Sequence, residues 1–243
     1  MARYLEYAVD LPLPENGGID ATVVRAKIAA QMEMSPEYGF DRRIFHYTPD
    51  KHPAAGVSPF RFGGGKSFRI YASGEDAVQL LSAEAHKVTR LLELAYGVEL
   101  CERRRTGIYS AGINPTLQTF RIPSLVLQQS PNQYRKLMTM NPAEREEWIG
   151  GLILKGLANQ FRTLGLTFEL DDPMFVFGDV SVGGGYSPIE VKPGIYFLSA
   201  RRVTFRANIR LEGPYHVGHL VSRGYGAILR DIPKKASRPH RTG

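Results

Sequence analysis

The fold is decided around EDAVQLLSAEAHKVTRLLELAY, residues 75–96, which is the clearest helix pattern in the sequence. Its apolar residues recur at spacings of three and four, which places them on one face of an α-helix. They are Val78, Leu81, Ala85, Val88, Leu92 and Ala95. Gly97 follows directly and is expected to end the helix.

Upstream of this helix the sequence shows strand and helix patterns in turn. Residues 3–11 alternate apolar and polar side chains, as a half-buried strand does. Asp20 can cap a helix over residues 21–34. RRIFHY, residues 42–47, predicts a second strand, and SFRIYA, residues 67–72, predicts a third.

The remaining part of the first half completes a known pattern. Residues 49–67 hold three prolines and four glycines and predict a long loop. VELCERRRTGIYS, residues 98–110, predicts a fourth extended segment. The predicted order is β-α-β-β-α-β, which is that of a ferredoxin-like unit.

The second half is rich in strand patterns and contains one long helix. LQTFRIPSLVLQ, residues 117–128, predicts a strand, and NPAE at 141–144 predicts a capped helix start. Five extended runs follow Gly165: TFEL (167–170), MFVFGDVSV (174–182), IEVKPGIYFL (189–198), RRVTFRANIRL (201–211) and YGAILR (225–230). The sequence therefore predicts an α+β fold of two tandem ferredoxin-like, RRM-like domains, residues 1–112 and 113–243.

The charge of the chain indicates a polyanionic partner. The formal net charge is +7, the pI is about 9.5, and the 31 basic residues comprise 22 arginines and 9 lysines. Guanidinium groups match phosphate oxygens with two donors at once, although an arginine-rich genome would give the same composition. The single Cys101 excludes an internal disulfide and a cysteine zinc site. No apolar run is long enough to span a bilayer, so we expect a cytoplasmic protein with no membrane partner.

A glycine-rich segment near the middle of the first half resembles a phosphate loop but lacks its spacing. In GGGKS, residues 63–67, the glycine required five residues before Gly65 is replaced by Phe60. The segment is still basic, with Lys66 flanked by Arg61 and Arg69. It is either an RNA-contacting loop or an ordinary surface loop.

The most specific motif is GPYHVGHLVSRGYGAIL, residues 213–229, with glycines at 213, 218, 224 and 226. Such glycines allow another backbone to approach closely. His216 and His219 have a metal-like spacing, but no third ligand is apparent, so we expect no metal site. The glycine pattern after a strand such as VTFRANIRLEG resembles the glycine-rich loop, here residues 213–226, of the RAMP superfamily of CRISPR-associated proteins. Together with the tandem ferredoxin-like order, it is similar to the repeat-RNA endoribonucleases of that superfamily.

The resemblance implies cleavage of CRISPR repeat RNA without a metal or a cofactor, by attack of a ribose 2′-hydroxyl on the neighbouring phosphate. In that family a histidine near the first helix and second strand is often the base, and His46 lies in the matching region, with Tyr38, Arg42 and Arg43 nearby. Some branches lack this histidine, and the crowded arginines make the chain similar to the divergent type IV branch. Arg25, Arg42 and Arg43 would then stabilise charge on the phosphate, because guanidinium does not act as a base.

Further residues are expected to bind the RNA stem-loop. Arg202, Arg206 and Arg210 have even spacing in a predicted strand, so they should form a ladder on one face. The other predicted RNA contacts, apart from Arg61, Lys66 and Arg69, are Arg103, Arg104 and Arg105, the loop residues Gly218, His219, Arg223, Gly224 and Gly226, and the tail residues Lys234, Lys235, Arg238 and Arg241.

Two other functions stay open at this point. The chain could be a non-catalytic RAMP subunit that binds guide RNA in a CRISPR effector complex. It could also be a metal-dependent nuclease that uses Asp171, Asp172 and Asp179, although two aspartates before Pro173 are equally typical of a turn. The favoured hypothesis is the endoribonuclease, which retains its product and binds other CRISPR effector subunits.

Overall fold

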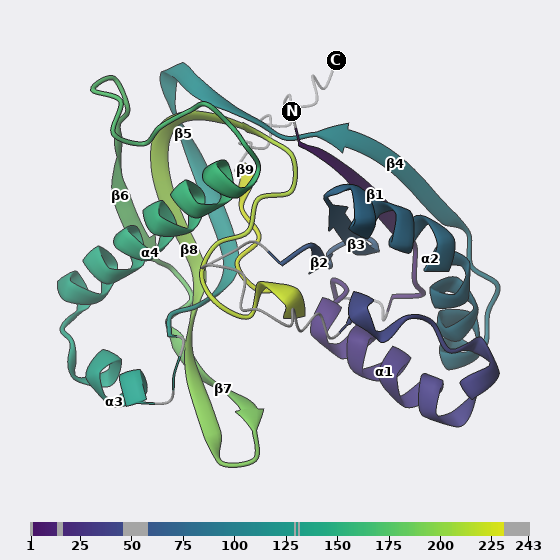
Figure 1. Ribbon diagram of the computed structural model, residues 1–243. Helices are drawn as coiled ribbons and strands as arrows, with labels where there is room; N and C mark the ends of the chain where they lie inside the picture. Colours follow the sequence, from purple (N-terminus) through teal and green to yellow (C-terminus); the bar gives the residue numbers. More distant parts are fainter. Residues whose placement is uncertain (1, 14–16, 46–57, 129, 131, 231–243) are drawn as a thin grey trace, which may run out of the picture.

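The computed structural model describes residues 2–13, 17–45, 58–128, 130 and 132–230. Two antiparallel sheets lie side by side, each with helices packed against it (Figure 1). Each sheet has its own hydrophobic core. The predicted α+β class is confirmed.

The first sheet contains β1 (Arg3–Val9), β2 (Phe60–Gly63), β3 (Phe68–Ser73) and β4 (Glu102–Ile108) in the order β2-β3-β1-β4, with all neighbours antiparallel. Helices α1 (Ala21–Met34) and α2 (Glu75–Tyr96) bury their apolar stripes on one face of this sheet. Both helices have the predicted bounds. The predicted β-α-β-β-α-β order is therefore present in the first half.

The second strand is not where the sequence pattern placed it. Arg42–Ile44 forms the short 3-10 helix η2, which follows η1 (Pro36–Tyr38), so the predicted strand is absent over residues 42–45, and residues 46 and 47 lie outside the described residues. The strand β2 lies inside the predicted long loop. Its residues Phe60, Arg61 and Phe62 are all buried, because helices cover one face and the C-terminal half covers the other. A strand of four residues buried on both faces shows no alternation of exposure to detect.

The second sheet is built on two long strands, β5 (Ser110–Val126) and β8 (Ile195–Glu212). Adding β6 (Phe177–Val182) and β9 (Leu229–Arg230) gives the order β6-β8-β5-β9, which corresponds strand for strand to the first sheet. The strand β7 (Tyr186–Lys192) forms a hairpin with the start of β8. The predicted run at 167–170 is not a strand; Phe168 and Leu170 instead pack against the core.

One face of the second sheet is covered by α4 (Pro142–Thr163), which follows the short helix α3 (Asn132–Thr139). The predicted cap of α4 is confirmed: Asn141 Oδ1 accepts from Glu144 N, and Glu144 Oε2 accepts from Asn141 N, each at 2.9 Å. Residues 213–228, between β8 and β9, contain the 3-10 helix η3 (Val221–Arg223) where the first half has α2.

The two halves meet at Arg61, whose side chain is fully buried. Its Nη1 donates to the carbonyl oxygen of Pro214 at 2.9 Å, and its Nη2 donates to Ser73 and Tyr109. Tyr109 lies between β4 and β5 and belongs to the second core. The division of the chain at residues 112 and 113 stays a prediction.

Candidate functional site

Helix α1 places Arg25 beside Phe45 and Phe62. Asp20 caps the helix, with its Oδ1 accepting from Thr22 N at 2.7 Å. Arg25 lies off the buried stripe of Ala21, Val24 and Ile28. Its guanidinium is half-buried instead between two rings, at 5.2 Å from the Phe45 centroid and 4.6 Å from the Phe62 centroid. This position is set by the helix and by the aromatic residues that flank it.

The Arg25 guanidinium is incompletely satisfied within the described part of the chain. Its Nη2 donates to the carbonyl oxygen of Phe45 at 2.8 Å, while its buried Nε has no hydrogen-bond partner there. Burial, and secondarily the nearby positive charge of Arg223, lower the pKa of Arg25 to about 10. The group is still a cation at neutral pH.

The glycine-rich loop brings Arg223 to the same place. Thr22 Oγ1 in α1 donates to the carbonyl oxygen of Arg223 at 3.1 Å. Gly224, which follows η3 with φ of 95°, is so close to α1 and β2 that a Cβ atom there would lie 3.1 Å from the Cβ of Ala21 and 3.3 Å from the oxygen of Phe62. Glycine at this position therefore allows the loop to dock against the first half.

Two arginines thus adjoin where the halves meet. Neither Arg25 nor Arg223 forms an ion pair with a carboxylate of the described residues. Arg223 Nη1 only reaches the carbonyl oxygen of Val191, in the β7 strand, at 3.5 Å. Two neighbouring cations without a counter-ion are the arrangement that a phosphate group stabilises.

The remaining loop glycines serve contacts inside the protein. A Cβ atom at Gly226 (φ 77°) would overlap the carbonyl oxygen of Val217, and Gly226 N donates to Ser124 O at 2.8 Å. Gly218 packs against Leu125, and the backbone of His219 bonds to Val126. Burial and the charge of Lys155 lower the pKa of His219. The loop is held as an ordered unit on the end of β5.

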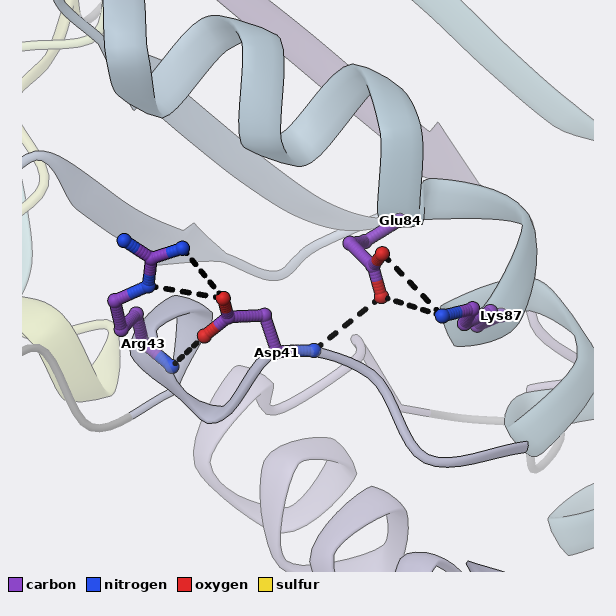
Figure 2. A network of polar contacts seen from close by, with 4 residues as sticks. All are labelled: Asp41, Arg43, Glu84 and Lys87. Atoms are coloured by element: carbon purple, nitrogen blue, oxygen red, sulfur yellow. Dashed lines mark hydrogen bonds and ion pairs between the residues drawn. The ribbon is translucent and has the colours of Figure 1, made fainter. Parts of the chain in front are cut away.

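The other predicted catalytic residues lie on the 3-10 helices after α1. Figure 2 shows Arg43 directed at Asp41, with Arg43 Nη2 at 2.6 Å and Nε at 2.9 Å from Asp41 Oδ2. The backbone N of Asp41 in turn donates to Glu84 of α2 at 3.3 Å, and Glu84 pairs with Lys87 at 3.0 Å. The hydrogen bond from Arg43 lowers the pKa of Asp41. Arg43 is thus engaged in a surface network.

Tyr38, Arg42 and His46 have separate surroundings. The guanidinium carbon of Arg90 lies 5.5 Å from the Tyr38 ring centroid, which fixes Tyr38 against α2. Arg42 is exposed and has no ion pair with a described residue. His46 lies outside the described residues. Arg42 and Arg43 lie on η2, next to Phe45, whose carbonyl oxygen accepts the hydrogen bond from Arg25.

The predicted contact of Arg61 with RNA is not supported, because this side chain is fully buried in the junction. Lys66 is exposed in the turn between β2 and β3.

The arginines of β4 are each paired with a carboxylate: Arg103 with Asp10 at 2.7 Å, Arg104 with Glu102, and Arg105 with Glu6 at 2.5 Å. Arg104 also reaches Ser82 of α2, so it lies on the helix side of the sheet.

The predicted ladder on β8 is present in part. Arg206 and Arg210 are exposed on the face opposite the buried Val203, Phe205, Ala207 and Ile209, whereas Arg202 is exposed at a left-handed backbone position (φ 51°) where the alternation of the strand is interrupted. Arg206 pairs with Asp179 at 3.1 Å, and Arg210 lies 3.6 Å from Glu212. Arg202 Nη2 donates to the carbonyl oxygen of Gly183 at 2.7 Å.

Arg121 was missed by the sequence analysis. It is exposed on β5 directly opposite Thr204, and therefore lies on the same face as the β8 ladder. The signal was available in the sequence, because Arg121 stands between the apolar residues Phe120 and Ile122 in a predicted strand. The predicted tail contacts Lys234, Lys235, Arg238 and Arg241 lie outside the described residues.

Two of the three aspartates considered for a metal-dependent site, Asp172 and Asp179, have structural partners. Asp172 Oδ1 accepts from Met174 N at 2.8 Å in a turn, and Asp179 pairs with Arg206. Among the residues that the structure describes, no three His, Cys, Asp or Glu side chains gather where they could hold a metal ion. His216 is buried edge-on to Tyr71, with ring centroids 6.0 Å apart, and burial lowers its pKa to about 3.

Of the described helices, none has the length and apolar character needed to cross a membrane.

Residues 8–233 match the family model of the type IV CRISPR-associated endonuclease Csf5. The chain belongs to this family. The solved structure of "Csf5, CRISPR-Cas type IV Cas6 crRNA endonuclease" is similar over 96% of this chain and 100% of that chain, with 19% identity and a TM-score of 0.65. A Cas6b crystal structure is similar over 95% of this chain and 100% of that chain, with 13% identity and a TM-score of 0.61. These two likenesses establish the fold, and a comparison with curated proteins finds no match.

Proposed function

We propose that this Csf5-family protein is a processing endoribonuclease that binds the stem-loop of CRISPR repeat RNA and cleaves it without a metal ion. The observation that carries the proposal is the pair of Arg25 and Arg223, which have no carboxylate partner among the described residues. Family membership and the crRNA endonuclease named among the similar structures support it.

The proposed reaction is an internal transesterification. The ribose 2′-oxygen attacks the adjacent phosphorus, the bond to the 5′-oxygen breaks, and the products are a cyclic phosphate and a 5′-hydroxyl. The phosphorane that forms carries extra negative charge, which fixed cations stabilise more strongly than they stabilise the starting phosphate. Arg25 and Arg223 fill this role, with Arg42 and Arg43 on the adjoining 3-10 helix as further candidates.

Proton transfer is assigned separately from charge stabilisation. A guanidinium does not deprotonate at neutral pH, so the arginines cannot remove the 2′-hydroxyl proton. His46 is the proposed base, with Tyr38 nearby in the sequence as a supporting group. The leaving 5′-oxygen takes one proton from water, which balances the proton that the base removes from the 2′-hydroxyl.

The stem is proposed to lie on exposed arginines. The ladder of Arg202, Arg206 and Arg210, extended by Arg121, provides a sheet face without a covering helix. The glycine-rich loop, Lys66, Arg69 and the β4 arginines, together with the tail, are the other proposed contacts. Retention of the product for other effector subunits remains part of the proposal.

The deciding experiment is single-turnover cleavage of repeat RNA in EDTA. We expect a cleaved stem-loop with a cyclic phosphate end, and no cleavage of a substrate whose ribose at the cleavage position is 2′-deoxy. Dependence on added Mg²⁺ would contradict the proposal. Tight binding with no cleavage under any condition would favour the non-catalytic guide-RNA subunit instead.

A further inference from the structure

A row of four side chains crosses the first sheet on the face away from its helices. The register places Arg61 opposite Tyr71, Tyr71 opposite Glu6, and Glu6 opposite Arg105. Opposite residues of antiparallel strands point to the same side of a sheet. Glu6 is at the centre of this row, and only 7% of its side chain is exposed.

Glu6 binds an arginine from each neighbouring strand. Its Oε2 accepts from Arg105 of β4, at 2.7 Å from Nε and 2.5 Å from Nη2. Its Oε1 lies 3.5 Å from Nε of Arg69, in β3. One nearly buried carboxylate therefore holds two guanidinium groups, and the three side chains keep a net charge of +1.

The two arginines remain open to a ligand despite this contact. The side chain of Arg105 is 70% exposed and that of Arg69 is 35% exposed. Arg105 contacts Glu6 through Nε and Nη2, whereas Arg69 contacts Glu6 through Nε and also hydrogen-bonds to the Tyr71 side chain. A guanidinium tied along one edge presents its other edge in a fixed direction, which suits a phosphate oxygen.

We propose that Glu6 is a positioning residue for RNA, which fixes Arg69 and Arg105 on the sheet face before the ligand arrives. The inference rests on the proposed RNA-binding function. Long side chains lose conformational freedom when they bind, and a group that is already ordered avoids that loss on association. Glu6 thus strengthens the binding of a polyanion even though its own charge repels one.

The sign of this effect separates positioning from simple charge. Glu6→Gln raises the net charge by one unit, so charge alone predicts tighter RNA binding. Positioning predicts the reverse, a loss of about three- to tenfold in affinity for repeat RNA. The maximal single-turnover rate should stay near the wild-type value, while the protein concentration at half-maximal rate rises by the same factor.

The matched control is Glu93→Gln. Glu93 is also a largely buried carboxylate paired with an arginine, Arg90 at 3.1 Å, but it lies on α2 and changes the charge equally. We expect this variant to bind RNA as tightly as the wild type or more tightly. Equal affinities of Glu6→Gln and Glu93→Gln would overturn the proposal.

A second variant keeps the test decisive if Glu6→Gln does not fold. Arg105→Lys keeps the positive charge at a mostly exposed position but cannot make the two-donor contact with Glu6. It should weaken RNA binding by a similar factor, and wild-type affinity would refute the positioning role. If the wild-type protein itself neither bound nor cleaved repeat RNA, the proposed function would fail; loss of the Glu6 effect alone would leave that function standing.

Discussion

Arg61 of β2 donates a hydrogen bond to the carbonyl oxygen of Pro214 at 2.9 Å, across the junction between the two sheets. The side chain is completely buried and also bonds to Ser73 and Tyr109. A buried arginine with three acceptors from distant parts of the chain has a structural role in fixing the two halves together.

Arg61→Ala should therefore lower the free energy of unfolding. The change leaves a cavity and three acceptors without their donor, which costs about 3 kcal/mol in all. Urea unfolding measures the effect, with Arg162→Ala on the exposed side of α4 as the control, where we expect less than about 0.5 kcal/mol. Equal stabilities of the two variants would argue against the junction as described.

Arg25→Ala should slow cleavage with little change in stability. Removing one fixed cation from a developing phosphorane raises the barrier by roughly 2 to 4 kcal/mol. Arg223→Ala should fall in the same range, and Arg162→Ala should cleave normally. Single-turnover rates at saturating protein provide the comparison. Wild-type rates for Arg25→Ala, Arg223→Ala, Arg42→Ala and His46→Ala, all folded, would place the active site elsewhere, with the basic tail as the next region to test.

The pH dependence of cleavage separates a histidine base from an arginine-only site. An ordinary histidine has a pKa near 6.5, so the rate should rise through about pH 6 to 7 if His46 is the base. His46→Ala should then lose roughly 100-fold and flatten the profile. A nearly silent His46→Ala change, together with slow arginine variants, would assign the reaction to charge stabilisation alone.

Gly224→Val should weaken both the fold and RNA binding. The side chain would be forced into a backbone conformation with φ of 95° and against Ala21 and Phe62. Gly226→Val should be worse, because its Cβ would overlap the oxygen of Val217. Thermal unfolding measures the stability of both variants. Gly151→Ala is the control, because this helical glycine has open space around it, and the change should raise the free energy of unfolding by about 0.5–1 kcal/mol. A Gly226→Val variant with wild-type stability would contradict the close contact.

The stability of the protein should fall between pH 6.5 and about pH 3. Burial, and then the charge of Arg61, lower the pKa of folded His216 to about 3, so the unfolded chain binds this proton first. Stability is full above the unfolded pKa and is lost as the pH falls, by about 2 kcal/mol at pH 5. His219 contributes with the same sign. The difference in pH slope between wild type and His216→Gln isolates the His216 share, and identical slopes would contradict it.

Hydrophobic periodicity was sufficient for much of the fold. The apolar residues of α1, α2 and β8 each pack against one surface, so their spacing in the sequence shows which face is buried. The cap at Asn141 depends only on residues within one turn of the helix, so the sequence shows it directly. Strand β2 was not predicted because tertiary contacts bury both of its faces, so its residues show no alternation of buried and exposed side chains. RRIFHY was mistaken for a strand because its first residues form a 3-10 turn held by Asp41, whose side chain accepts from Arg43 N.

The candidate site was harder to predict than the fold. The sequence pointed to Arg25 and to the glycine-rich loop separately, since 197 residues lie between Arg25 and Arg223 in the chain. Their proximity depends on Gly224 docking against Ala21, which local patterns cannot show. Sequence also treats all arginines alike, whereas the structure divides them into buried, carboxylate-paired and unpaired groups.

The connection between the sheets has a mechanical consequence. Strand β4 ends at Ile108 and β5 begins at Ser110, so a single residue, Tyr109, joins them without a linker (Figure 1). Because the backbone passes from one sheet directly into the next, a rotation of one half has to move the other half with it. The two halves therefore hold one relative orientation before any ligand binds.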